Sequence, residues 1–355
     1  MIVPPPKERD PKLQNELFRL PERPKVHGVL TGYWTGRPVL LQCTYLIREI
    51  DSAPDKWLPS LFSDARDHGI QAVPAFTLSE IAKLGAAVRT SVSRIGELAL
   101  GIIISSAELG DPELPEKINS GLDALRVGSS ECIVFADFAD SDLSEPEIVA
   151  PIIRASYECL ERIGPWKHIA FQATSYPEHN PASHGLTARV DRNEWLAWTA
   201  AVDYQRNPRD DLLFGDFVAD CAKMSFGESQ ARAIRHMRYT TNECWFVVRA
   251  SETGRDADRM RQVCKRIVES AWYDGRSYSM ADDRIFRIAH GLAGPGTATD
   301  WRAVNTGHHI SRVVRDLGAV RNIHFARLDE TKLESPQEGI PHLLGASGHG
   351  PKGDA

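Results

Sequence analysis

The sequence predicts an α/β protein whose parallel sheet forms a (β/α) barrel or a variant of that barrel. Short apolar runs, rich in β-branched and aromatic residues, alternate along the chain with segments whose apolar residues recur at helical spacing. Most of the short runs are apolar on both faces, as the strands of a parallel sheet covered by helices must be. The alternative is an open parallel sheet followed by an α+β region after about residue 205.

Seven runs have the length and composition of strands. Each ends at polar residues or at glycine or proline, which favour turns. They are 38–45, 71–77, 98–105, 131–138, 168–174, 212–217 and 244–249. A first or last strand could also lie in 25–33 or 323–328, and a total near eight would suit a closed barrel.

The clearest helices are predicted over 144–163 and 256–272. In the first, Ile148 and Ile152 belong to one apolar stripe, and Ser144 with Glu147 fits a capping box. The second also has one apolar face. Strands that alternate with such helices are expected to pair in parallel through right-handed crossovers.

The composition of the chain and the lack of a linker sequence favour one domain. The chain has 355 residues, of which 42% are hydrophobic, so it can bury a large core. No fixed-period repeat or Gly/Ser linker divides it, and a single domain over residues 1–334 is the simpler organisation. Residues 335–355 are rich in glycine and proline and are expected to form a loose tail.

Charge and cysteine spacing exclude several classes of function. A net charge of -6 argues against a broad basic surface for nucleic acid. The proline-rich start does not fit a secretory signal, and no apolar run approaches the ~20 residues that span a bilayer, so a cytoplasmic protein is expected. The six cysteines form no CxxC pair, which favours reduced thiols, and neither a metal nor a cofactor is predicted.

An ordered series of motifs in the C-terminal half resembles the Beta protein family of phages and bacterial mobile elements. Members show a G-D-[YF] strand, an R-Y strand followed by an aromatic strand, and a late W-R…HH segment. The corresponding stretches are LLFGDF at 212–217, IRHMRYTTNECWFVVRA at 234–250, SYSMADDRI at 277–285 and GPGTATDWRAVNTGHHI at 294–310. The resemblance covers about residues 205–320, whereas the N-terminal half keeps only Pro6-Lys7 of the family's usual opening and lacks its Gly-Glu.

The resemblance implies a biological setting and no reaction. The family takes its name from a phage-satellite protein linked genetically to countering a killing protein, and its members look like components of phage–host conflict systems. On this basis the chain is expected to be a binding or regulatory partner in a phage-defence or toxin-control system. Its partner would be a protein encoded by a neighbouring gene.

The alternative is a barrel enzyme of unknown reaction, with its site where the carboxyl ends of the strands converge. The candidate catalytic residues are Asp137, Asp216, Arg238 and His308. The two carboxylates and the histidine have side chains that suit acid–base chemistry. Asp216 lies inside an apolar run and is expected to pair with Arg238, because a buried carboxylate needs a partner. The candidate ligand-binding residues come from strand ends and a late loop: Gln172, Arg249, Trp301, Arg302 and His309.

Several candidates also have a structural interpretation. Asp137 could end a strand and, with Asp140, cap the helix that begins near Ser144. His308 and His309 are expected to open a helix, with side chains about 100° apart, so they could not share one metal ion. Either could instead be a capping or core histidine. Trp301 is expected to pack its loop against the barrel.

Overall fold

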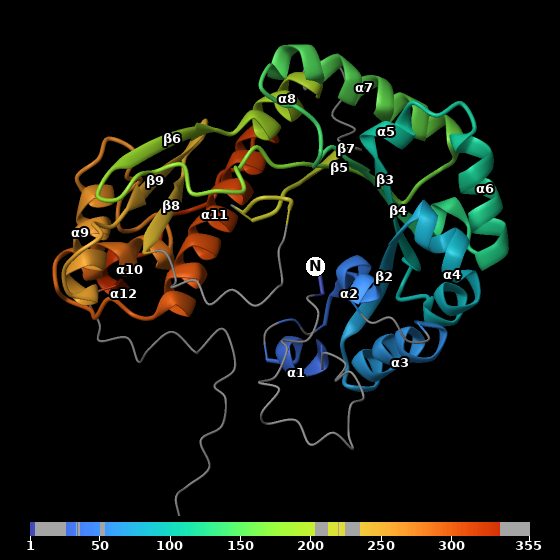
Figure 1. Cartoon of the computed structure of the whole chain (residues 1–355), viewed down its shortest axis with the longest axis horizontal. Coiled ribbons are helices and arrows are strands. Elements are labelled where there is room, and N and C mark those ends of the chain that lie inside the picture. The colour runs from blue at the N-terminus through green and yellow to red at the C-terminus, as the bar shows by residue number, and fades with distance from the viewer. Residues whose placement is uncertain are drawn as a thin grey trace, which may run out of the picture. The chain divides into compact units, whose positions relative to one another are not determined.

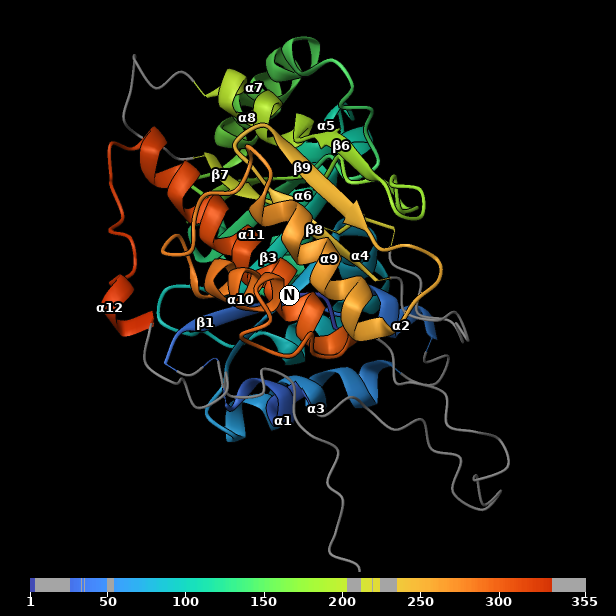
Figure 2. The same cartoon turned by 90° about the vertical axis from the view of Figure 1, so that its left-hand side faces the viewer.

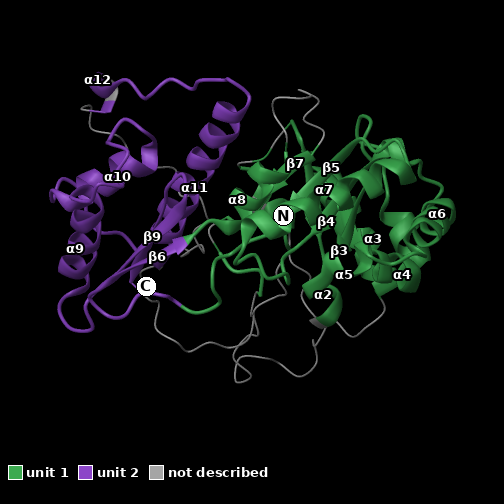
Figure 3. Ribbon diagram, turned by 90° about the horizontal axis from the view of Figure 1, so that it is seen from above, with its two compact units in different colours: residues 1–179, 191–232 green, residues 180–190, 233–355 purple. Residues whose placement is uncertain are grey.

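The computed structural model of the chain describes residues 1–3, 26–32, 34, 36–49, 54–202, 212–218, 220–223 and 235–333. The chain divides into two compact units, coloured separately in Figure 3. Unit 1 comprises Met1–His179 and Asp191–Arg232, and unit 2 comprises Asn180–Val190 and Ala233–Ala355. The prediction of one domain over residues 1–334 stays a prediction, and the predicted tail at 335–355 lies outside the described residues.

Unit 1 is built on a parallel sheet in which the order of the strands is β1-β2-β3-β4-β5-β7. All five neighbouring pairs are parallel, so every strand ends at the same edge of the sheet. The strands are β1 (Pro38–Gln42), β2 (Gln71–Thr77), β3 (Leu100–Ser105), β4 (Cys132–Asp137), β5 (His168–Gln172) and β7 (Leu212–Gly215). The sheet curls into a half-barrel (Figure 1).

Helices of unit 1 connect these strands and lie along the convex side of the sheet (Figure 1). Strand β4 buries alternate residues: Cys132 and Val134 are buried, whereas Ile133 and Phe135 on the other face are half-exposed. Strands β2 and β3 are instead buried on both faces. The helices are α1 (Val26–Leu30), α2 (Thr44–Glu49), α3 (Pro54–Asp67), α4 (Leu78–Ser91), α5 (Ser106–Leu109), α6 (Leu114–Leu125), α7 (Pro146–Ile163) and α8 (Asn193–Ala201), with a short 3₁₀ helix η3 (Ser129–Glu131) before β4.

Unit 2 packs helices against an antiparallel sheet of order β6-β9-β8. Its strands are β6 (Thr187–Asp191), β8 (His236–Thr240) and β9 (Cys244–Arg249), and its helices are α9 (Asp256–Val268), α10 (Met280–Ala289), α11 (Ala298–Val320) and α12 (Glu330–Leu333). Met237 and Tyr239 of β8 share one core with apolar residues of α9, α10 and α11. Figure 2 shows α9 crossing the sheet.

Two side chains of α11 take the place of a further strand beside β8. The backbone N–H of Arg238 donates to Oδ1 of Asn305 at 2.9 Å, and Nε2 of His308 lies 2.8 Å from the carbonyl oxygen of Thr240. An edge strand exposes unpaired backbone groups that favour aggregation unless something covers them. Helix α11 therefore both covers the core and satisfies part of this edge.

The predicted fold class, α/β with a barrel-like parallel sheet, is confirmed. Six of the seven predicted strands form that sheet, which is open within the described residues. The seventh, at 244–249, belongs instead to the antiparallel sheet of unit 2, as the alternative α+β arrangement after about residue 205 would have it. The further strand candidates are wrong: Val26–Leu30 is helical, and 323–328 contains no strand.

The helix predictions need two corrections of detail. Helix α7 has Glu145 at its N-cap without a side-chain cap bond, so the predicted capping box is wrong. Its buried face includes Ile153 and Leu160, whereas Ile148 and Ile152 are exposed. Within the described part of the chain, no helix combines the length and apolar character needed to cross a membrane.

Candidate functional site

Polar side chains line the carboxyl edge of the sheet in unit 1. Ser105 of β3 pairs in register with Asp137 of β4, which pairs with Gln172 of β5. Residues in register on neighbouring parallel strands point to the same face, and the strands lie about 4.8 Å apart. Ser105, Asp137 and Gln172 therefore form a row, which we call the edge row, on the face opposite the buried side chains of β4.

Asp137 carries a carboxyl group in a poorly hydrated position. Burial raises its pKa to about 6, Asp140 adds to the rise, and a hydrogen bond from the backbone of Ala139 opposes it. That bond, 3.0 Å from the amide nitrogen to Oδ1, turns the chain after β4. Asp137 thus ends a strand, as its structural interpretation expects, but α7 starts at Pro146 with Glu145 at its N-cap. The interpretation of Asp137 as a cap for that helix is wrong.

A second carboxyl group follows β6, at the start of α8. The side chains of Glu194 and Arg192 are fully buried, with 3.8 Å between Glu194 Oε1 and Arg192 Nε. Ser175, three residues beyond β5, donates its backbone N–H to Glu194 Oε2 at 3.1 Å and accepts from the Glu194 backbone at 3.0 Å. Burial raises the pKa of Glu194 to about 7, Arg192 opposes the rise, and Asp216 adds to it.

Asp216 belongs to this neighbourhood because its charge acts on Glu194. Its Oδ1 accepts the backbone N–H of Val218 at 2.9 Å, and Val218 has a φ of 57°, which is strained for a β-branched residue. Gly215 leaves little room for a side chain: a Cβ there would lie 3.2 Å from the carbonyl oxygen of Phe171. Asp216 and Arg238 belong to different units, and their predicted pairing stays a prediction.

His308 lies in the core of unit 2, inside α11 and not at the start of a helix as predicted. Its Nδ1 is 3.0 Å from Asp282 Oδ2, and its ring stacks on Tyr239 with centroids 3.8 Å apart. Asp282 also accepts from the Tyr239 hydroxyl at 2.7 Å and from Ser279 at 2.5 Å. With its bond to β8, His308 ties α10 and α11 to the sheet, which suits a core histidine.

The remaining predicted residues of unit 2 have mainly structural contacts. His309 Nδ1 lies 3.0 Å from the hydroxyl of Thr240, and Arg249 donates to the carbonyl of Ala182 at 3.1 Å. Trp301 packs in the core of unit 2 and its indole N–H donates to the carbonyl oxygen of Pro295 at 2.6 Å. It anchors its loop to that core, whereas the prediction placed the loop against the barrel. Arg302 is exposed, and Arg238 Nε donates to His236 at 3.0 Å.

The structure thus brings together Asp137 and Gln172 in unit 1 and places Arg238 and His308 in unit 2. Sequence reasoning missed Glu194 and Arg192, whose signal is a pair of charged residues just before the apolar stretch WLAW. Among the described residues, no group of three or more His, Cys, Asp or Glu side chains could hold a metal ion.

Comparison with known proteins identifies one family. The family model described as Beta protein matches residues 3–315, so the similarity extends far beyond residues 205–320 and includes the N-terminal half. It covers both the edge row of unit 1 and the buried histidine of unit 2. No curated protein and no solved structure matches the chain.

Proposed function

We propose that unit 1 of this chain, which belongs to the Beta protein family, is an enzyme unit that binds a polar ligand at the carboxyl edge of its sheet and performs acid–base chemistry on it. The edge row carries this proposal. It combines a carboxyl group with an amide and a hydroxyl on three consecutive strands, in register.

The position of the row supports a site. In parallel α/β sheets ligands bind outside the carboxyl ends of the strands, because the loops that follow the strands meet there. The amide of Gln172 can donate and accept hydrogen bonds, which suits the orientation of a polar ligand. The Ser105 hydroxyl donates to Glu108 Oε2 at 2.7 Å, and its oxygen can still accept. The row therefore offers both specific contacts and a titratable group.

The chemistry of the carboxyl groups supports acid–base work. A catalytic acid or base is most effective when its pKa lies near the working pH. Asp137 meets this condition, because its pKa is raised to about 6. Glu194 provides a second carboxyl group, whose pKa is raised to about 7. Glu194 is fully buried, so we assign it the role of holding the loop after β5 through Ser175. Asp137 is assigned the contact with the ligand.

Equilibrium dialysis tests this function. The full chain would be dialysed against a small-molecule extract of its host, and the retained compounds would be identified by mass spectrometry. We expect at least one polar compound to be enriched by the wild type and lost with Asp137→Asn or Gln172→Leu. Enrichment that survives both substitutions, or a wild type that enriches nothing, would contradict the proposal.

The second candidate function is a binding or regulatory partner in a phage-defence or toxin-control system. It includes a cytoplasmic location and a protein partner from a neighbouring gene, and it rests on the phage–host setting that the resemblance to the family implies. The exposed side chains of Ile148 and Ile152, one turn apart on α7, also favour a protein contact, with 61% and 54% of their surfaces exposed.

Phage plating on host cells, with the neighbouring genes present, tests this second function. We expect the chain to change plating efficiency and Ile152→Asp to abolish that change, while Asp137→Asn leaves it intact. Ile152 is exposed, so its substitution is not expected to unfold the protein. Recovery of the chain alone from its native host in every condition would count against a partner.

A further inference from the structure

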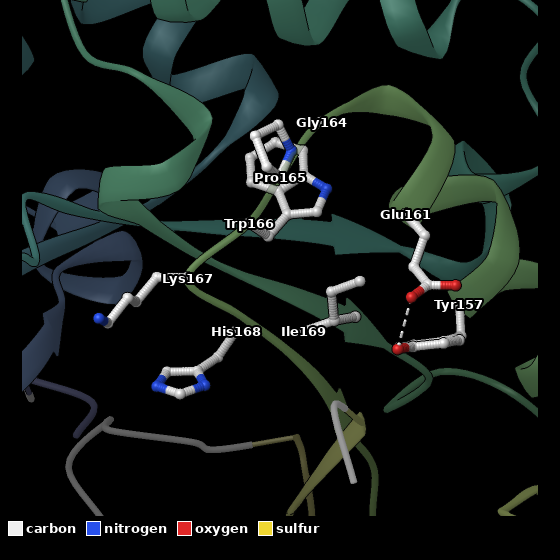
Figure 4. Close-up of a pocket in the computed structure, with 8 residues that line it drawn as sticks. All are labelled: Tyr157, Glu161, Gly164, Pro165, Trp166, Lys167, His168 and Ile169. Atoms are coloured by element: carbon white, nitrogen blue, oxygen red, sulfur yellow. Dashed lines mark hydrogen bonds between the residues drawn. The ribbon is translucent and has the colours of Figure 1, made fainter. Parts of the chain in front are cut away.

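A separate pocket of about 250 Å³ lies at the amino end of β5, where the chain leaves α7 (Figure 4). His168 opens β5 and Gln172 closes it, so the pocket is at the opposite end of this strand from the edge row. In Figure 4 Tyr157 and Glu161 extend from α7 on one side of the strand, while Lys167 and His168 extend on the other. The pocket is smaller than the ~300–1,000 Å³ typical of sites for drug-sized ligands.

The carboxylate of Glu161 gives the pocket a negative wall. Its Oε1 accepts a hydrogen bond from the Tyr157 hydroxyl at 2.8 Å, and among the described residues it forms no ion pair with a lysine or arginine. Helix α7 ends at Ile163, and the carboxyl end of a helix carries a partial negative charge. The one lysine in the lining, Lys167, is already paired with Glu97.

Two aromatic residues complete the pocket. Tyr157 and Trp166 both contribute to its lining, and both are half-buried. Trp166 Nε1 donates to the carbonyl oxygen of Leu160 at 2.7 Å, which holds the indole in place against the last turn of α7. An aromatic face attracts a cation through the negative charge at its centre.

We propose that this pocket binds a small organic cation of the alkylammonium class, whose charged head lies beside Glu161 and against Tyr157 and Trp166. The carboxylate and the helix end favour positive charge, and the aromatic rings favour a head group that is weakly hydrated. The inference concerns a different site from the edge row and does not depend on it.

Isothermal titration of the full chain tests the proposal with choline and its neutral isostere 3,3-dimethylbutan-1-ol. The two probes share shape and differ in charge. A cation–π contact and an exposed carboxylate predict millimolar binding of choline, about tenfold tighter than binding of the alcohol. Glu161→Gln is expected to remove most of that difference, and Trp166→Leu to weaken choline alone.

Glu158→Gln is the matched control, because Glu158 is exposed on the same helix and does not line the pocket. It should leave choline binding unchanged, and circular dichroism would verify that each variant is folded. Equal affinity for choline and the alcohol would overturn the proposal. So would the absence of saturable choline binding in the millimolar range, or equal effects of Glu161→Gln and Glu158→Gln.

Discussion

Replacement of Asp137 by asparagine is expected to stabilise the protein at neutral and alkaline pH. The carboxyl group of Asp137 has its pKa raised from the ordinary 3.8 to about 6, chiefly by burial. The folded state therefore holds this proton more tightly than the unfolded chain does. It follows that stability falls as the pH rises from about 4 to about 6, and stays reduced above that window.

The magnitude follows from the same two values. A difference of about two pKa units corresponds to about 3 kcal/mol, since each unit equals about 1.4 kcal/mol. Asp137 is half-buried, so water screens part of this cost, and we expect about 1–3 kcal/mol. Asparagine keeps the side-chain oxygen that accepts from Ala139, so the turn after β4 is retained.

Urea unfolding followed by circular dichroism, near pH 4 and near pH 8, measures the effect. Asp137→Asn should raise the free energy of unfolding near pH 8 and change it little near pH 4. The control is Asp142→Asn, for which the opposite effect is expected. Hydrogen bonds from Ser144 lower the pKa of Asp142, so loss of this carboxylate should destabilise the protein at high pH. A variant at position 137 that is less stable near pH 8, or equally stabilised at both pH values, would refute the reasoning.

Three further substitutions test the packing of the two units. His308→Ala should cost about 3–5 kcal/mol in the free energy of unfolding, because it leaves the carboxylate of Asp282 without its histidine in a buried site; a loss below about 1 kcal/mol would contradict this. Gly101→Ala should cost about 1–3 kcal/mol, since its Cβ would lie 2.6 Å from Leu40 and 2.9 Å from Ala75. Gly85→Ala, in open space on α4, should instead stabilise by about 0.5–1 kcal/mol, and thermal melting of both variants measures the contrast.

The stability cost at Asp137 bears on its function. In its charged form Asp137 destabilises the folded state, and asparagine could keep the same turn without that cost. The carboxyl group therefore has no evident structural advantage over an amide. Enzymes often retain such residues at their sites, since activity and stability compete there. A more stable Asp137→Asn variant that loses its ligand would therefore support the proposed site in two independent ways.

Local pattern was enough to locate most strands of this protein. Runs such as 98–105 and 131–138 are apolar and bounded by turn residues, and each contains an observed strand. Strand β6 was missed, because Thr187–Asp191 alternates between exposed and half-buried residues and carries little apolar signal. The row formed by Asp137 and Gln172 was partly predictable, since the ends of parallel strands share an edge.

The sequence by itself determined the α/β class, the positions of the parallel strands and the carboxyl residues at their ends, because these depend on composition and spacing over a few residues. Only the tertiary structure decided that 244–249 pairs with 236–240 in a separate antiparallel sheet. It also decided that His308 is enclosed between β8 and Asp282, and that Glu194 is buried beside Arg192. Those outcomes depend on contacts between residues far apart in the chain. The elements that pack around a charged group decide whether it is desolvated and which partner it meets.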